Sequence, residues 1–166
     1  MPQILQDLAR TVSRDFYSQE FTTQAGIVNY YHLNSNGMGG HVDDTELTFE
    51  HPVVSISLGL CSGIFLLQTS KDKVLPILMR PGDVLIFFGP LQLAMHGMPC
   101  VLQPDLRFMR TQYKHNTFRD LGITSNAEEL KISKEDLPFL QSYVSTHRIN
   151  INLQQVLPMA LTTFLL

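Results

Sequence analysis

The sequence predicts a mainly β protein, built as a sandwich or a barrel. Between residues 25 and 102, short runs rich in β-branched and aromatic residues recur at regular intervals, separated by Gly, Pro, Asn and Asp. Near the end of the chain, polar and apolar residues alternate one by one, as they do in a strand with one buried side. Helices are therefore expected only at the flanks of these strands.

Length and composition favour one folded unit. The chain of 166 residues has about the length of one domain, and we expect residues 1–166 to fold together. Hydrophobic residues make up 44% and charged residues 16%, which is typical of folded proteins. The net charge of -3 provides no general attraction for nucleic acid. Cys61 and Cys100 lack CxxC spacing, which favours a reduced, intracellular protein, and no apolar run is long enough to predict a membrane helix.

The first elements are a helix, a strand and a loop. Residues 4–16 predict a short amphipathic helix, because apolar side chains recur there at helical spacing, at Leu5, Leu8, Val12 and Phe16. The run "AGIVNYYHL", residues 25–33, predicts a strand by its β-branched and aromatic residues. The Gly- and Asn-rich stretch "NSNGMGG", residues 34–40, then predicts a loop, with His41 at its exit.

The middle of the chain predicts four more strands. "PVVSISLGL" and "GIFLLQT" are two strands, separated by Cys61 and Ser62. "VLPILMRPGDVLIFF", residues 74–88, predicts a hairpin whose turn is Arg80-Pro81-Gly82-Asp83, since Pro and Gly are typical of such turns.

The last third of the chain is less regular until it reaches a strand. Residues 103–132 are polar and aperiodic, and we expect them to form a surface insertion. Ser133, with Asp136 three residues later, predicts the start of a helix. The strand "RININL", residues 148–153, follows, and the alternation that continues to residue 154 predicts one polar face, formed by Arg148, Asn150, Asn152 and Gln154.

Three side chains predict a metal site. His41 and Asp43, two residues apart, lie on the same side of an extended segment, and His96 at the end of a later strand is the best third ligand. Two imidazoles and one carboxylate with open positions form the facial triad of non-heme Fe(II) oxygenases. Asp44 and Glu46 are rival carboxylates without this spacing. We interpret the remaining histidines as surface or capping residues: His32, His51, His115 and His147.

Several ordered motifs resemble the AlkB-type Fe(II)/2-oxoglutarate dioxygenases, and within them the subgroup of the eukaryotic first AlkB homologue. The resemblance rests on "AGIVNYYHL", "GGHVDD", "PVVSISLG" with "IFLL", "RPGDVLIFFGPLQLAMHGMPCVL" and "RININLQQVL". It implies a double-stranded β-helix, or jelly roll, with a few flanking helices and with core strands at about residues 25–102 and 148–157. It also implies the cofactors Fe(II), 2-oxoglutarate and O₂.

The resemblance assigns roles by position. It makes the triad of His41, Asp43 and His96 the iron ligands and the catalytic centre. Asn29 and Tyr31 match a pair that helps hold 2-oxoglutarate. Arg148 matches the arginine that binds the distal carboxylate of 2-oxoglutarate, and Asn150 matches the asparagine of the same motif.

Gln154 departs from the family pattern, which has a second arginine near the metal-bound end of 2-oxoglutarate. Glutamine keeps a donor but loses the charge, so we expect weaker binding of the cosubstrate, by ~1–3 kcal/mol. A rival register would place the closing motif at residues 113–119 and use Arg119 instead of Arg148. We favour Arg148, because residues 111–119 lack the apolar alternation of a core strand.

By resemblance, the function is oxidative demethylation of methylated nucleobases in tRNA or DNA, with a role in tRNA modification or DNA repair. This implies a nucleic-acid partner and a nuclear, cytoplasmic or mitochondrial location, and leaves the oligomeric state open. Family members place a nucleotide-recognition lid ahead of the barrel, and only about two dozen residues precede the first predicted strand here. Two alternatives remain: a non-catalytic binding or regulatory module, favoured by Gln154, and a metal-storing cupin-like barrel.

Overall fold

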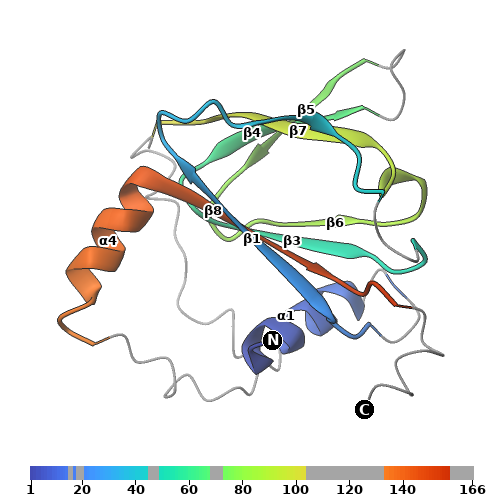
Figure 1. Ribbon diagram of the computed structural model, residues 1–166, viewed down its shortest axis with the longest axis horizontal. Coiled ribbons are helices and arrows are strands. Elements are labelled where there is room, and N and C mark those ends of the chain that lie inside the picture. Colours follow the sequence, from blue (N-terminus) through green and yellow to red (C-terminus); the bar gives the residue numbers. More distant parts are fainter. Residues whose placement is uncertain (15–16, 18–20, 45–48, 68–72, 104–132, 158–166) are drawn as a thin grey trace.

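A computed structural model describes the chain except for residues 15–16, 18–20, 45–48, 68–72, 104–132 and 158–166 (Figure 1). The elements, in chain order, are α1 (Gln3–Arg14), β1 (Ala25–His32), β2 (Met38–His41), β3 (Val53–Gly59), β4 (Ser62–Leu67), β5 (Leu75–Met79), β6 (Val84–Phe87), the 3₁₀ turn η1 (Gly89–Leu91), β7 (Met95–Val101), α4 (Leu137–Thr146) and β8 (His147–Gln154). No helix in these ranges is both long and apolar enough to cross a membrane.

Two four-stranded antiparallel sheets face each other (Figure 1). One has the strand order β1-β8-β3-β6, and the other has the order β2-β7-β4-β5. The last strand of the chain thus lies between β1 and β3, pairing along its whole length with β1 and over six residue pairs with β3. The predicted jelly roll is confirmed, and the space between its two sheets is where inward side chains from both meet.

The predicted hairpin at residues 74–88 is wrong in its pairing, although its turn is correct. The Asp83 N–H donates to the Arg80 carbonyl at 3.0 Å, and Gly82 has a φ of 90°. However, β5 pairs with β4 in one sheet, whereas β6 pairs with β3 in the other. The turn therefore crosses between the sheets. It is held there by Ser57, whose carbonyl accepts from the Gly82 N–H at 2.7 Å.

The predicted loop at residues 34–40 is also partly wrong, because Met38 to Gly40 belong to β2. This short strand pairs with β7, with Met38 opposite Met98 and His41 opposite His96. At Gly37, with a φ of 71°, a Cβ atom would lie 2.1 Å from the Met98 carbonyl oxygen. Glycine is needed here because the two backbones approach closely. The glycines that predicted a loop are therefore explained by the pairing of β2 with β7.

Helix α1 covers the outer face of the β1-β8-β3-β6 sheet, close to the prediction for residues 4–16. Ala9 is fully buried and packs with Val54, Ile56 and Leu153, which point outward from β3 and β8. Leu5, Leu8 and Val12 surround this cluster, as their spacing predicts. Phe16, the last predicted residue of the helix, lies outside the described residues. Because the apolar residues of β8 point towards α1, its polar residues must point between the sheets.

Helix α4 begins one turn later than predicted. The Ser133 hydroxyl donates to the Asp136 carboxylate at 2.6 Å and accepts from the Asp136 N–H at 2.9 Å, but the helix itself starts at Leu137. It ends directly at β8, with the His147 N–H donating to the Tyr143 carbonyl. The expected surface insertion and the rival register around Arg119 lie outside the described residues.

Candidate metal centre and cosubstrate pocket

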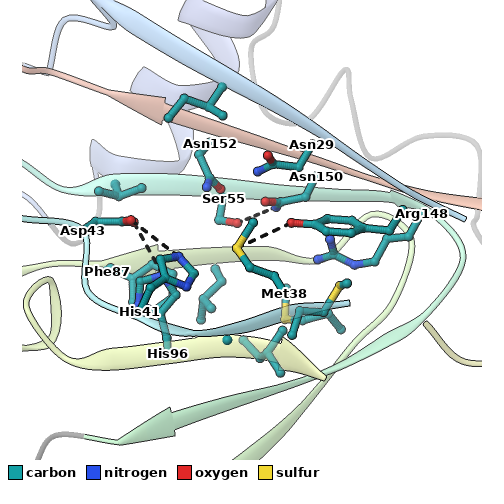
Figure 2. Close-up of a pocket in the computed structure, with 18 residues that line it drawn as sticks. Asn29, Met38, His41, Asp43, Ser55, Phe87, His96, Arg148, Asn150 and Asn152 are labelled. Atoms are coloured by element: carbon teal, nitrogen blue, oxygen red, sulfur yellow. Dashed lines mark hydrogen bonds and ion pairs between the residues drawn. The ribbon is translucent and has the colours of Figure 1, made fainter. Parts of the chain in front are cut away.

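A cavity of about 170 Å³ lies between the two sheets, large enough for a small organic molecule. Inward side chains of β1, β3, β6 and β8 form one wall, and side chains of β2, β4, β5 and β7 form the other. Two groups of polar residues occupy opposite ends of it (Figure 2). One is the predicted triad, and the other surrounds Arg148.

The structure brings the three predicted metal ligands together. His41 at the end of β2 lies opposite His96 in β7, and Asp43 follows two residues after His41. The His41 Nε2 atom is 3.6 Å from Asp43 Oδ1, and the His96 Nε2 atom is 3.5 Å from Asp43 Oδ2. All three potential ligand atoms lie within 4.8 Å of one another, which fits one shared cation.

Backbone carbonyls set the orientation of both imidazoles. The Nδ1 atom of His41 bonds to the Gly39 carbonyl, and the Nδ1 atom of His96 bonds to the Ala94 carbonyl, each at 3.0 Å. A carbonyl only accepts, so each Nδ1 carries the proton and each Nε2 presents its lone pair to Asp43. Lone pairs that face a carboxylate require a proton or a cation between them. The donor set therefore fits a bound divalent metal.

Without a metal, a proton can lie between an imidazole Nε2 atom and the Asp43 carboxylate. The hydrogen bond with Asp43 raises the pKa of His96, against the opposing effect of burial. The same hydrogen bond lowers the pKa of Asp43, again against burial. Both shifts show that this end of the cavity stabilises positive charge next to the carboxylate.

Arg148 at the other end is a buried cation without a counter-ion among the described residues. It is 3% exposed, and its Nη2 donates to the Ser57 hydroxyl at 3.0 Å. Its Nε is buried and has no hydrogen-bond partner in the part of the chain that the structure describes. Its Cζ lies 5.8 Å from the centre of the Tyr31 ring. Burial lowers the pKa of Arg148. An uncompensated buried charge is costly, so this end of the cavity is suited to an anion.

Asn29, Tyr31 and Asn150 line the cavity beside Arg148. The Tyr31 hydroxyl donates to Met38 Sδ at 3.8 Å, and burial raises the pKa of Tyr31, which keeps its phenol protonated as a donor. The Asn150 Nδ2 atom donates to the Ser55 hydroxyl at 2.7 Å and to the Ile56 carbonyl at 3.3 Å. Asn150 is thus engaged by β3, while Asn29 and Tyr31 face the open space.

Gln154 is the one candidate site residue that does not line the cavity. It lies opposite Ala25 at the end of β8 and is 5% exposed. The alternation of β8 does place it on the same side as Arg148, as predicted. Its position is therefore inward but beyond the cavity wall.

The other histidines have separate surroundings. His51 is 2% exposed and bonds through Nδ1 to the side-chain hydroxyl of Tyr17 at 2.7 Å, so it is a buried residue and its interpretation as a surface or capping histidine is wrong. His32 is exposed, and His147 stacks on Tyr143 with ring centres 4.0 Å apart. His115 and the rival carboxylate Glu46 lie outside the described residues, and Asp44 is exposed.

Several pocket residues were missed by the sequence analysis. Phe87 packs against His96 with ring centres 5.3 Å apart, and the Met38 sulfur accepts a hydrogen bond from the Tyr31 hydroxyl. Ser55 in the lining and Ser57 behind it accept hydrogen bonds from Asn150 and Arg148 of β8. The alternation in "VVSIS" could have predicted that both serines lie on one face of the strand and that Val54 and Ile56 lie on the other. Knowing which face is inward requires the pairing with β8.

Comparison with known proteins places the chain in a family. Residues 1–153 match the model of the 2OG-Fe(II) oxygenase superfamily. The chain is 34% identical to the DNA N(6)-methyladenine demethylase ALKBH1A of Arabidopsis thaliana, over 83% of this chain and 36% of that protein. It is 35% identical to the nucleic acid dioxygenase ALKBH1 of Mus musculus, over 94% of this chain and 40% of that protein.

More distant relatives agree. The chain is 25% identical to the tRNA demethylase abh1 of Schizosaccharomyces pombe, over 95% of this chain and 45% of that protein. A solved structure, "The structure of OsALKBH1", matches the fold with a TM-score of 0.60 and 22% identity, over 93% of this chain and 66% of that one. The chain spans about two fifths of the length of its curated relatives. The AlkB-type resemblance is confirmed, and the chain belongs to the 2OG-Fe(II) oxygenase superfamily.

Proposed function

We propose that this chain is the catalytic core of an Fe(II)/2-oxoglutarate-dependent dioxygenase that oxidatively demethylates nucleobases in tRNA or DNA. One observation carries the proposal: a group of two histidines and an aspartate and an uncompensated buried arginine lie at opposite ends of one cavity. A metal chelator with an anionic tail fits both ends at once, and 2-oxoglutarate has this form.

His41, Asp43 and His96 would hold the iron through the two Nε2 atoms and a carboxylate oxygen, with the remaining positions open to the cavity. Bound iron would supply the redox chemistry that couples oxidation of 2-oxoglutarate by O₂ to hydroxylation of a methyl group. The protein's own part is to fix the two imidazoles by their Nδ1 protons and to line the cavity in which the reactants would lie.

Arg148 would bind the distal carboxylate of 2-oxoglutarate, because it is the buried cation at the end of the cavity away from the triad. The protonated phenol of Tyr31 and the amide of Asn29 line the same end and can donate to that carboxylate. Binding would thus supply the missing counter-ion of Arg148.

The reaction balances with these reactants. A substrate N–CH₃, 2-oxoglutarate and O₂ give N–CH₂OH, succinate and CO₂, and the N–CH₂OH group then separates into N–H and formaldehyde. A methylated nucleobase is favoured as the substrate, because relatives carry names that specify nucleic acid, DNA or tRNA. An enzyme that acts on tRNA or DNA would be located in the nucleus, the cytoplasm or the mitochondria. The alternative of a non-catalytic module is disfavoured by those same names and by the intact triad.

The test is a titration with Fe(II) and 2-oxoglutarate under anaerobic conditions. Chelation of the iron by the 2-oxo acid produces a visible charge-transfer band, and admission of O₂ should then release one succinate per cosubstrate consumed. An ordered iron site without this band would contradict the proposal and favour a metal-binding module. Formaldehyde release from methylated tRNA or DNA then tests the substrate.

A further inference from the structure

A bulge in β2 turns Met38 into the cavity. On β7, His96 and Met98 are two residues apart. The residues opposite them on β2, His41 and Met38, are three apart, so β2 contains one extra residue. In a regular strand, side chains three residues apart point to opposite faces, but here both line the cavity. Bulges re-aim side chains in this way, so the inward position of Met38 is built into the local fold.

The Met38 thioether lies in the middle of the cavity. It belongs to the residue pair next to the two histidines, about 7 Å further along the strands at their usual rise. Figure 2 shows Met38 between the triad and Arg148. Its Sδ atom accepts a hydrogen bond from the Tyr31 hydroxyl at 3.8 Å. A ligand that reaches both ends of the cavity must therefore pass this sulfur.

Met38 and a bound carboxylate would compete for the same proton. The Tyr31 hydroxyl has one hydrogen, which goes to Met38 in the ligand-free protein. The function proposed above requires that hydrogen for the distal carboxylate of 2-oxoglutarate. A thioether sulfur is a weak acceptor, whereas a carboxylate forms stronger, charge-assisted hydrogen bonds. Reduced Met38 is therefore easily displaced from Tyr31 by the ligand.

Oxidation of the sulfur would change this balance. A peroxide transfers one oxygen atom, so that R–S–CH₃ and H₂O₂ give R–S(=O)–CH₃ and H₂O; the sulfur loses two electrons and the peroxide gains them. The sulfoxide is larger and polar, and its oxygen is a stronger acceptor than the thioether. We propose that Met38 is a redox switch, whose sulfoxide retains the Tyr31 proton, fills the path between the two ends of the cavity and so prevents binding of 2-oxoglutarate. The identity of the excluded ligand rests on the proposed function.

Burial separates Met38 from the other methionines near the site. Met79 and Met98 also line the cavity, but they are only 4% and 5% exposed, whereas Met38 is partly exposed and open to a small oxidant. Met95 is 38% exposed and does not line the cavity, because it precedes His96 in β7 and points to the outer face of that sheet. Met95 is therefore the matched control, since its sulfoxide forms outside the cavity.

The test is treatment of the metal-free protein with hydrogen peroxide. The peroxide is then removed, a thiol reductant resets Cys61 and Cys100, and the protein is loaded with Mn(II), so that binding is measured without turnover. Peptide mass spectrometry reports the oxygen gained at each methionine, and calorimetry reports ligand affinity. Besides 2-oxoglutarate, two ligands are compared: succinate keeps the distal arm without the chelating end, and oxalate keeps only a chelating end.

We expect protein oxidised at Met38 to bind 2-oxoglutarate and succinate at least about tenfold more weakly, and oxalate less than twofold. Oxalate is spared because it chelates the metal without reaching Tyr31. Met38→Leu keeps a similar apolar volume without the sulfur, so its affinities should survive the same treatment. Met95→Leu should lose affinity for 2-oxoglutarate on oxidation, as the wild type does.

Three results would overturn the switch: Met38 left unmodified when Met95 is fully oxidised, unchanged affinity of protein oxidised at Met38, or an equal loss in Met38→Leu. Thermal unfolding and Mn(II) affinity are measured for every sample, and a loss of ligand binding that accompanies unfolding would also overturn it. A wild-type protein that binds Mn(II) but not 2-oxoglutarate before treatment would overturn the proposed function itself, and the switch with it.

Discussion

His41 and His96 face each other across β2 and β7, with their ring centres 4.4 Å apart. Each ring is held by a hydrogen bond from Nδ1 to a backbone carbonyl two residues earlier, of Gly39 and Ala94 respectively. The same local arrangement thus orients both imidazoles on neighbouring strands. Because neither hydrogen bond involves a metal, the protein itself organises the site before an ion binds.

Removal of one ligand should abolish the metal site. We expect His41→Ala and Asp43→Ala to lose stoichiometric binding of Fe(II) or Mn(II), because a two-ligand site has poor geometry for either ion. Calorimetry or equilibrium dialysis measures this. The control is His32→Ala, since His32 is exposed and is not part of the triad. Full metal affinity in both triad variants would show that the ion binds elsewhere.

Replacement of Arg148 should stabilise the ligand-free protein while it destroys cosubstrate binding. Arg148 is buried without an ion-pair partner among the described residues, so Arg148→Met removes a desolvated charge and keeps similar volume. We expect the free energy of unfolding to rise by up to ~2 kcal/mol and the stabilisation by 2-oxoglutarate to vanish. Denaturant titrations with and without the ligand measure both effects.

Arg119→Ala serves as the comparison for that experiment. It should leave cosubstrate binding nearly unchanged, because the closing strand is β8 and carries Arg148. The reverse ranking of the two arginine variants would mean that the rival register around Arg119 supplies the distal contact.

His51 should make folding sensitive to mild acid. Burial lowers the pKa of His51 below its ordinary value of 6.5, against a smaller opposing effect of Glu50. The unfolded chain then binds a proton that the folded protein does not, so the contribution to stability is present above about pH 6.5 and is lost as the pH falls below it. Unfolding free energies measured between pH 7.5 and 5 should show this slope. In His51→Phe the slope should be shallower; an identical slope would assign the acid sensitivity to other groups.

The sequence predicted the strands of this protein better than their partners. Alternation in residues 148–154 depends on one strand alone, and it placed Arg148 and Asn150 on the correct face. Pairing depends on contacts between distant segments, which is why the turn at Arg80–Asp83 was predicted but the crossing between sheets was not. Local composition also misled where glycine serves close packing, as at Gly37.

In the candidate site, too, local features were predicted and contacts between distant segments were not. The spacing of His41 and Asp43 is local and was visible in the sequence, and the structure adds that their partner His96 lies directly opposite on β7. The hydrogen bonds that hold Arg148 and Asn150 to the serines of β3 could not be predicted, because they depend on the pairing of two distant strands. Motif matching placed Gln154 beside the metal-bound end of the cosubstrate, since it compares positions along one chain and not the cavity wall, which Gln154 does not line.

Gln154 allows a test of whether the chain is a weakened form of its family's site. The residue lies at the end of β8, on the same side of the strand as Arg148, and does not line the cavity. Arginine is longer than glutamine, so we expect the guanidinium of Gln154→Arg to reach further towards the triad end of the cavity than the amide does. We expect it to tighten 2-oxoglutarate and oxalate by up to about tenfold, or ~1.4 kcal/mol, and to leave succinate unchanged. Succinate production from 2-oxoglutarate by the iron-loaded protein should rise with it.

Unchanged affinity for both chelating ligands would show that position 154 does not reach the metal-bound end of the cosubstrate.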